Sequence, residues 1–211
     1  MRQEKPKQLL PINGQAIFIY SVRRFLTYNV RGIVILVFNP NYLQEAQSQI
    51  NAHLASFHAQ IHLIAGGASR YESVQNGIRQ YKSIFVAVHD AVRPFASLRL
   101  FESCYKAAQL HKAAIPAIEV TDSLRQIDAI NQNKAVDRKG FQAVQTPQCF
   151  QFDLLQDAYE QADPSISTDD ASIVEQFGHP IHLIKGEVEN IKITHPLDLQ
   201  MAALLQDKLE Y

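Results

Sequence analysis

The sequence of 211 residues predicts an α/β protein built on a three-layer, largely parallel sheet. First, short apolar runs rich in β-branched residues alternate with segments of helical periodicity almost throughout the chain. Second, several of these runs are bounded by Gly, Pro or Asp, as is typical of strands buried on both faces. Third, glycines, acids and bases follow the runs, where open α/β sheets bind their ligands.

Composition narrows the class of protein. Hydrophobic residues make up 46% of the chain, enough for one domain over residues 1–211 with a substantial core. Twenty basic against twenty-one acidic residues exclude the broad basic field of a non-specific nucleic-acid binder. No apolar run reaches the roughly 20 residues of a membrane span, and the start lacks a secretory signal. Cys104 and Cys149 have no partners at metal-ligand spacing, so free thiols in a cytoplasmic protein are expected.

The first third of the chain predicts a loop followed by alternating helices and strands. Residues 1–8 are charged and contain a proline, so the chain is expected to start in a loop without a strand before it. The next elements are a helix from Gln15 with Phe18, Val22, Phe25 and Leu26 on one face, a strand over Gly32–Phe38, an exposed helix over Asn41–His53 and a short strand over Ile61–Ala65.

A glycine-rich turn follows that strand. Gly66 and Gly67 precede a helix that begins near Tyr71, so the backbone is open to a ligand beside the unpaired N–H groups of a helix start. The turn matches neither G-x-x-x-x-G-K-[ST] nor G-x-G-x-x-G, which disfavours P-loop and dinucleotide sites. Ser73 serves either a ligand or the helix itself.

The run F-V-A-V-H-D-A-V-R-P, from Phe85 to Pro94, is the most informative segment. It predicts a buried strand that ends in a polar loop carrying Asp90 and Arg93. Asp90 is therefore placed as a ligand of a metal ion or a ribose, and Arg93 as a ligand of a phosphate. Alternatively, Asp90 caps the turn and Arg93 lies on the surface.

The remaining chain continues the alternation and adds a projecting hairpin. Residues 120–137 alternate apolar and polar side chains around an Asn-rich turn, so they are expected to form an arm that reaches a second subunit. The other elements are a helix with Leu98, Phe101, Tyr105 and Ala108 on one face, a strand over Ala113–Ile118, an edge strand over Val144–Phe150, a helix over Phe152–Ala162, a helix start capped within Ser167–Ala171, short strands over Ile181–Lys185 and Ile191–Ile193, and a closing helix from Thr194 or Pro196.

An ordered set of motifs resembles the 2-C-methyl-D-erythritol 4-phosphate cytidylyltransferase family over essentially the whole chain. The first and third motifs below also occur in related sugar-phosphate nucleotidyltransferases, whereas D-R-K-G before T-P-Q and the arm narrow the match. The motifs are P-K-Q at 6–8, G-G-A-S-R-Y-E-S-V at 66–74, H-D-A-V-R-P at 89–94, D-R-K-G-F at 137–141, Q-T-P-Q at 145–148, T-D-D-A-S at 168–172 and N-I-K-I-T at 190–194.

The resemblance implies a Rossmann-like nucleotidyltransferase fold, a homodimer joined through the arm, and a Mg²⁺-dependent reaction between CTP and a sugar-alcohol phosphate in non-mevalonate isoprenoid synthesis. It implies catalytic roles for Lys7, Arg138 and Lys192. CTP would be bound by Lys7, Gly66, Gly67, Ser73, Asp90 and Ala91, with Asp90 as the metal ligand. The acceptor phosphate would be bound by Arg138, Thr146 and Lys192, together with Arg93 and Ser123 of the neighbouring subunit.

Each assignment has a simpler alternative. Lys7 and Lys192 could be solvated surface lysines, and Arg138 could pair with Asp137. The family normally opens with a strand and a glycine-rich loop ahead of the position of Met1, so little or no turnover is expected from the chain as written. Ser123 stands where a threonine is usual, which keeps the hydroxyl. A ribitol-phosphate cytidylyltransferase and an inactive, dimerising or nucleotide-binding homologue are the competing functions.

Overall fold

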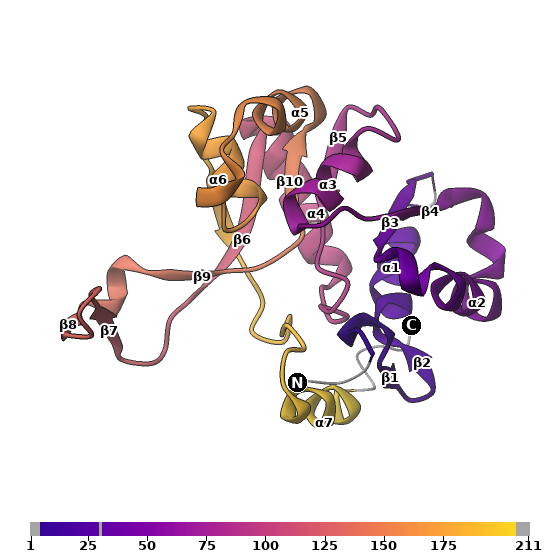
Figure 1. The fold of residues 1–211 in the computed structure, drawn as a ribbon, viewed down its shortest axis with the longest axis horizontal. Coiled ribbons are helices and arrows are strands. Elements are labelled where there is room, and N and C mark those ends of the chain that lie inside the picture. The colour runs from indigo at the N-terminus through magenta and orange to yellow at the C-terminus, as the bar shows by residue number, and fades with distance from the viewer. Residues whose placement is uncertain (1–4, 30, 206–211) are drawn as a thin grey trace.

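The computed structural model describes residues 5–29 and 31–205 and has the α/β architecture that the sequence predicts (Figure 1). The expectations for residues 1–4 lie outside the described residues. The α-helices are α1 (Ile17–Tyr28), α2 (Leu43–His53), α3 (Arg70–Ile78), α4 (Leu98–His111), α5 (Phe152–Gln161), α6 (Asp170–Gln176) and α7 (Pro196–Leu204). The 3₁₀ helices are η1 (Lys7–Leu9), η2 (Pro40–Tyr42), η3 (Ala55–Gln60), η4 (Arg138–Gly140) and η5 (Pro164–Ile166).

The strands form two main sheets and two small hairpins. A parallel pair joins β3 to β4, and a five-stranded sheet has the order β11-β6-β10-β5, with β9 pairing with β6. The hairpins are β1–β2 and β7–β8. The strand bounds are β1 (Pro11–Ile12), β2 (Gln15–Ala16), β3 (Val34–Phe38), β4 (Ile61–Ala65), β5 (Phe85–Val88), β6 (Ala113–Glu119), β7 (Leu124–Ile127), β8 (Asn133–Val136), β9 (Gln142–Val144), β10 (Gln148–Gln151) and β11 (His182–Lys185).

The side chains of β6 and β10 point alternately to the two faces of the sheet, and helices cover both faces to give three layers. Ala113 and Phe150 belong to the apolar cluster formed with α5 and α6. Their neighbours Ala114 and Cys149 pack instead with Cys104 of α4. Because successive side chains of a strand point to opposite faces, α4 covers one face of this sheet and α5 with α6 the other.

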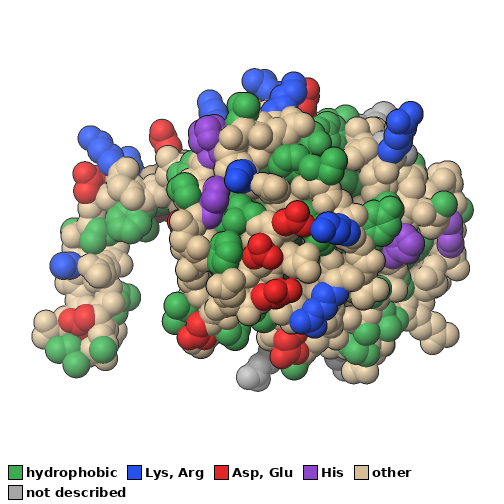
Figure 2. All heavy atoms as spheres, turned by 90° about the horizontal axis from the view of Figure 1, so that it is seen from above, with side chains coloured by type: hydrophobic (Ala, Val, Ile, Leu, Met, Phe, Trp, Pro, Cys, Tyr) green, Lys and Arg blue, Asp and Glu red, His purple; other side chains and the backbone are tan. Residues whose placement is uncertain are grey.

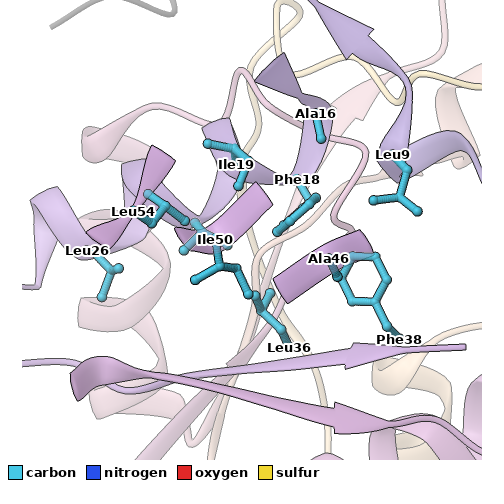
Figure 3. Close-up of a cluster of buried hydrophobic side chains, with 11 residues drawn as sticks. Leu9, Ala16, Phe18, Ile19, Leu26, Leu36, Phe38, Ala46, Ile50 and Leu54 are labelled. Atoms are coloured by element: carbon cyan, nitrogen blue, oxygen red, sulfur yellow. The ribbon is translucent and has the colours of Figure 1, made fainter. Parts of the chain in front are cut away.

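A second core lies between α1, α2 and the β3–β4 pair (Figure 3). Leu36 and Phe38 are buried on the face of β3 that meets these helices. The rings of Phe18 and Phe38 meet edge to face with centroids 5.1 Å apart. This packing orients β3, whose last residue, Phe38, accepts a hydrogen bond at its carbonyl oxygen from the N–H of Gly66 in the glycine-rich turn at 2.7 Å.

Two sequence predictions about the segment that contains β10 are wrong. Val144–Phe150 is not one strand: Val144 ends β9, and β10 begins at Gln148, after Pro147. Nor does β10 lie at an edge, because it pairs antiparallel with both β5 and β6. Pro147 is tolerated because it precedes the ladder and so removes no ladder hydrogen bond. The sheet is therefore mixed, with parallel pairing between β6 and β11 and antiparallel pairing around β10.

Two shorter predictions also change. Residues 191–193 are not a strand; Ile193 makes a single backbone hydrogen bond to the carbonyl of Val92. The helix expected from Gln15 begins at Ile17, since Gln15 belongs to β2. Helix α7 begins at Pro196, one of the two starts predicted.

The arm expected over 120–137 is an antiparallel hairpin in which Leu124 faces Val136. It stands away from the body of the protein in two perpendicular views (Figures 1 and 2). Ile127 and Ile130 are 64% and 75% exposed, which is a large apolar exposure for so short a segment. None of the described helices combines the length and apolar composition that a membrane crossing requires.

Candidate functional site

Asp90 is held between two cations just beyond the carboxyl end of β5. Its Oδ2 lies 3.0 Å from Nζ of Lys192 and 3.3 Å from Nε of Arg93. The Asp90 side chain is 18% exposed and that of Lys192 is 46% exposed, so Lys192 forms the open side of the cluster. Three of the predicted site residues thus come together although more than 90 residues of sequence separate Arg93 from Lys192.

The charge balance keeps Asp90 ionised. Burial by itself raises the pKa of Asp90, but the charge and hydrogen bond of Lys192, followed by the charge of Arg93, outweigh burial and hold the pKa below its ordinary value. A carboxylate that stays negative and partly open is suited to a divalent cation or to a ligand hydroxyl.

Arg93 is a buried support of this site. Its Nη1 donates to the carbonyl oxygen of Asn190 at 2.7 Å, and Nη2 donates to that of Val144 at 3.4 Å. The side chain is 11% exposed. Its guanidinium therefore ties three segments of the chain together from within its own subunit, whereas the sequence predicted contact with a phosphate of the neighbouring subunit.

Thr146 connects the same loop to His89. Its Oγ1 accepts a hydrogen bond from the backbone N–H of Asp90 at 3.0 Å and lies 3.0 Å from Nδ1 of His89. Because the carbonyl of Arg93 can only accept, Nε2–H of His89 donates to it at 3.1 Å. In the neutral ring Nδ1 then carries no proton and accepts from the hydroxyl of Thr146. Burial is the largest influence on His89 and lowers its pKa to about 4, which agrees with a neutral ring.

Asn190 and Gln145 are site residues that residue-by-residue reasoning missed. Both are buried, and the Asn190 amide donates to the carbonyl of Thr146 at 2.9 Å. Nε2 of Gln145 donates to the carbonyl of Glu187 at 2.7 Å. The sequence did contain a sign of their importance, because Asn190 and Gln145 are the first residues of the motifs N-I-K-I-T and Q-T-P-Q. Their burial could not be predicted, since polar side chains in loops are mostly exposed.

The glycine-rich turn is closed by its own hydrogen bonds. The N–H of Gly67 donates to Oγ of Ser73 at 3.1 Å, and that hydroxyl donates to the carbonyl of Ser69 at 2.8 Å. A Cβ at Gly66 would lie 2.8 Å from the same Oγ, so a larger residue there would displace the Ser73 hydroxyl from these bonds. Ser73 does not cap α3, because the N-cap is Ser69, whose side chain accepts from the N–H of Glu72. The predicted role of Ser73 toward CTP stays a prediction.

A second ion pair, between a half-exposed arginine and a buried aspartate, braces the start of α3 and was not singled out from the sequence. Nη1 and Nη2 of Arg70 donate to the two carboxylate oxygens of Asp170 at 3.2 and 2.5 Å. The hydroxyl of Tyr159 donates to Asp170 at 2.6 Å. At the start of α6, the predicted capping role belongs to Asp169, whose side chain accepts from the N–H of Ser172.

The other predicted residues lie elsewhere. Lys7 begins η1 and is half-buried, and its ammonium has no ion pair among the described residues. Arg138 is exposed at the base of the arm and donates to the carbonyl of Thr121 rather than pairing with Asp137. Ser123 is exposed just before β7. None of the three has a hydrogen bond to the Asp90 cluster within residues 5–29 and 31–205.

An open cavity of about 870 Å³ reaches this cluster. Ser73, Asp90 and Ala91, all predicted to bind CTP, belong to its lining, as do Arg70 and His89. The cavity thus brings the start of α3 to the same space as the loop after β5.

Comparison with known proteins identifies the family to which this chain belongs. The family model of 2-C-methyl-D-erythritol 4-phosphate cytidylyltransferase matches residues 1–207. This chain belongs to that family. The cytidylyltransferase of Bacteroides thetaiotaomicron is 39% identical over 97% of this chain and 93% of its own length, and that of Bacteroides fragilis is 40% identical with the same shares.

Solved structures agree on the cytidylyltransferase fold. The crystal structure of 2-C-methyl-D-erythritol 4-phosphate cytidylyltransferase from Thermus thermophilus has a TM-score of 0.79 and 30% identity, covering 96% of this chain and 94% of that one. The 4-diphosphocytidyl-2C-methyl-D-erythritol synthase of Anaerococcus prevotii has a TM-score of 0.83 and 26% identity, over 93% and 88%. The expected nucleotidyltransferase fold is thereby confirmed.

Proposed function

We propose that this chain joins CTP and 2-C-methyl-D-erythritol 4-phosphate, giving 4-diphosphocytidyl-2-C-methylerythritol and pyrophosphate for non-mevalonate isoprenoid synthesis. A phosphate oxygen of the acceptor attacks the α-phosphorus of CTP and forms a new P–O bond. The bond from that phosphorus to the bridging oxygen breaks, and pyrophosphate leaves with its electron pair. Such a reaction needs positioning and charge neutralisation more than covalent help from the protein.

The observation that carries the proposal is the Asp90–Lys192 pair at the carboxyl end of β5, 3.0 Å apart and open on the lysine side. A half-exposed ammonium beside an ionised carboxylate can neutralise a phosphate while the carboxylate faces a cation or a ribose. Lys7 and Arg138 supply further positive charge on the CTP and acceptor sides. Ser123 contributes its hydroxyl from the arm of a second subunit.

Mg²⁺ fits this site with one protein ligand. The described residues contain no group of three metal-binding side chains, but Mg²⁺ is commonly held by one or two carboxylates together with substrate phosphates. Asp90 would be that carboxylate. When bound, the ion would neutralise charge on the phosphate oxygens.

Three predicted ligands take a positioning role in this proposal. The hydroxyls of Ser73 and Thr146 and the guanidinium of Arg93 are all engaged in hydrogen bonds within the protein. They fix the glycine-rich turn, the Asp90 backbone and the Asp90 carboxylate, respectively. Gly66, Gly67 and Ala91 then present backbone groups to the cytidine.

We further propose that the enzyme works as a cytoplasmic homodimer. Its two cysteines are free and buried, which suits a reducing compartment. The exposed apolar residues of the arm suit contact with a second subunit.

Magnesium-dependent release of pyrophosphate from CTP tests the function. The assay compares 2-C-methyl-D-erythritol 4-phosphate with ribitol 5-phosphate as acceptors, with this chain alone and with an extension upstream of Met1. Lys192→Met should lower kcat/KM at least 100-fold, whereas Lys185→Met, which changes an exposed lysine on β11, should not. Release with ribitol 5-phosphate alone, or equal activity of both variants in a form of the protein that turns over, would refute the proposal.

A further inference from the structure

Lys192 lies in a segment that contains no helix or strand. Residues 186–193 follow β11 and lead to α7 without regular structure. Nevertheless Nζ of Lys192 is held 3.0 Å from Oδ2 of Asp90, and Asn190 and Ile193 in the same segment are fully buried. Buried backbone groups need hydrogen-bond partners, and this segment has no strand ladder to provide them. Other parts of the chain must therefore fix its backbone.

Gln145 fixes the start of this segment with a single side-chain amide. Its Nε2 donates to the carbonyl oxygen of Glu187 at 2.7 Å, and its Oε1 accepts from the N–H of the same residue at 3.1 Å. The same Nε2 donates to the carbonyl of Asn190 at 3.4 Å. Gln145 is 4% exposed, and its own N–H donates to the carbonyl of Pro116 in β6 at 2.8 Å. The amide thus pairs with Glu187 as a residue of a neighbouring antiparallel strand would.

The close approach of this amide depends on a glycine. A Cβ at Gly186 would lie 2.6 Å from Oε1 of Gln145 and 3.1 Å from the carbonyl carbon of Ala117 in β6. Because the second neighbour is sheet backbone, room for a larger residue is made most easily by displacing the Gln145 amide. The absence of a side chain at Gly186 therefore allows Gln145 to pair with Glu187.

The same segment is also attached to the loop after β5. The carboxylate of Glu187 accepts from the N–H and the hydroxyl of Ser97 at 3.2 and 2.5 Å. The N–H of Ile193, next to Lys192, donates to the carbonyl of Val92 at 3.0 Å. These bonds tie the segment to the loop that carries the acidic site residue, while Gln145 ties it to the sheet.

We propose that Gln145 is a positioning residue for the cytidylyl transfer, because its amide fixes residues 187–190 and so sets the place of the Lys192 ammonium beside Asp90. The inference rests on the proposed function of Lys192 at a phosphate. A lysine is a point charge on a flexible stem, so the path of its backbone decides which oxygens it reaches. A displacement of about 1 Å can cost roughly 100-fold in rate where reacting groups must be aligned.

A double-mutant cycle between Gln145 and Lys192 tests the proposal. Gln145→Met keeps the length of the side chain and removes its bonds to Glu187. The assay is pyrophosphate release from CTP with 2-C-methyl-D-erythritol 4-phosphate, in a form of the protein that turns over. Gln145→Met should lower kcat/KM at least tenfold in the otherwise unchanged protein but less than twofold in the Lys192→Met background, since no lysine is then left to position. Gln142→Met, which changes an exposed glutamine of β9, should have no effect in either background.

Two further measurements keep the test independent of one variant and of turnover. Gly186→Ala should reproduce the loss and its dependence on Lys192, because the added Cβ displaces the Gln145 amide. In this chain without substrate, Gln145→Met should speed amide hydrogen exchange at Glu187 at least tenfold, whereas Gln142→Met should not. Circular dichroism shows whether each variant is folded.

The outcomes distinguish this inference from the proposed function. An unchanged kcat/KM for Lys192→Met would refute the proposed function of that lysine, and the positioning role would fall with it. If Lys192→Met lowers kcat/KM but Gln145→Met causes an equal loss in both backgrounds, only the positioning role is overturned, because Gln145 then acts through the general structure. Unchanged exchange at Glu187 in folded Gln145→Met would also overturn it.

Discussion

His89 should make the stability of this protein depend on pH in a defined window. Its ring is held neutral between Thr146, which donates to Nδ1, and the carbonyl of Arg93, which accepts from Nε2. Protonation would break the first of these bonds and place a positive charge beside the guanidinium of Arg93. The perturbation is a fall in pH, compared between the protein and its His89→Gln variant.

The magnitude follows from the pKa of His89, which burial lowers from 6.5 to about 4. Because the folded pKa lies below the unfolded one, the unfolded chain binds the proton first as the pH falls. The neutral His89 ring therefore stabilises the folded state fully above pH 6.5, and this contribution to the free energy of unfolding is lost progressively as the pH falls toward 4. Between pH 7.5 and 5 the loss is at most about 2 kcal/mol, at about 1.4 kcal/mol per pH unit.

The assay is urea unfolding at several values between pH 7.5 and 5. His89→Gln should lower stability at pH 7.5 but should show a pH dependence flatter by up to about 2 kcal/mol, since every other titrating group is shared. The exposed His62→Gln variant is the matched control and should keep the original slope. Parallel stability curves for the protein and His89→Gln would show that His89 does not titrate differently in the folded and unfolded states.

Three further predictions concern the frame around the site. Asp170→Asn should destabilise the protein by about 2 kcal/mol in urea unfolding, less than the roughly 3 to 5 kcal/mol of a fully buried pair because Arg70 is 46% exposed; an unchanged midpoint would contradict this. Gly67→Ala should cost about 1 to 3 kcal/mol, since the added Cβ would lie 2.3 Å from a side-chain carbon of α3. Gly140→Ala, with nothing within 4 Å of the added Cβ, is its control and should be neutral in the same urea unfolding experiment. Ile130→Lys on the arm should shift the protein toward monomer in analytical ultracentrifugation, and an unchanged sedimentation coefficient would argue against an arm-mediated dimer.

Local patterns predicted most elements because their causes are local. The β-branched run before Asn39 predicts β3, and the alternating residues around the Asn-rich turn predict the β7–β8 hairpin. These local patterns did not predict the order of the strands in the sheets. Pro147 suggested an edge strand, yet β10 lies in the middle of its sheet because the ladder begins one residue later. Pairing depends on which segments meet in three dimensions, and no local pattern encodes that.

The sequence alone indicates the family, a strand that ends just before Asp90, and the motifs that contain the site residues. The expected burial of that strand is wrong, because β5 is half-buried with Ala87 exposed. Which of the site residues meet follows only from the folded chain. It joins Asp90 to Lys192, buries Arg93 among backbone carbonyls, and leaves Arg138 exposed at the arm. The physical reason is that residue types and spacings report local conformation, whereas charge pairing and burial depend on contacts between segments far apart in the chain.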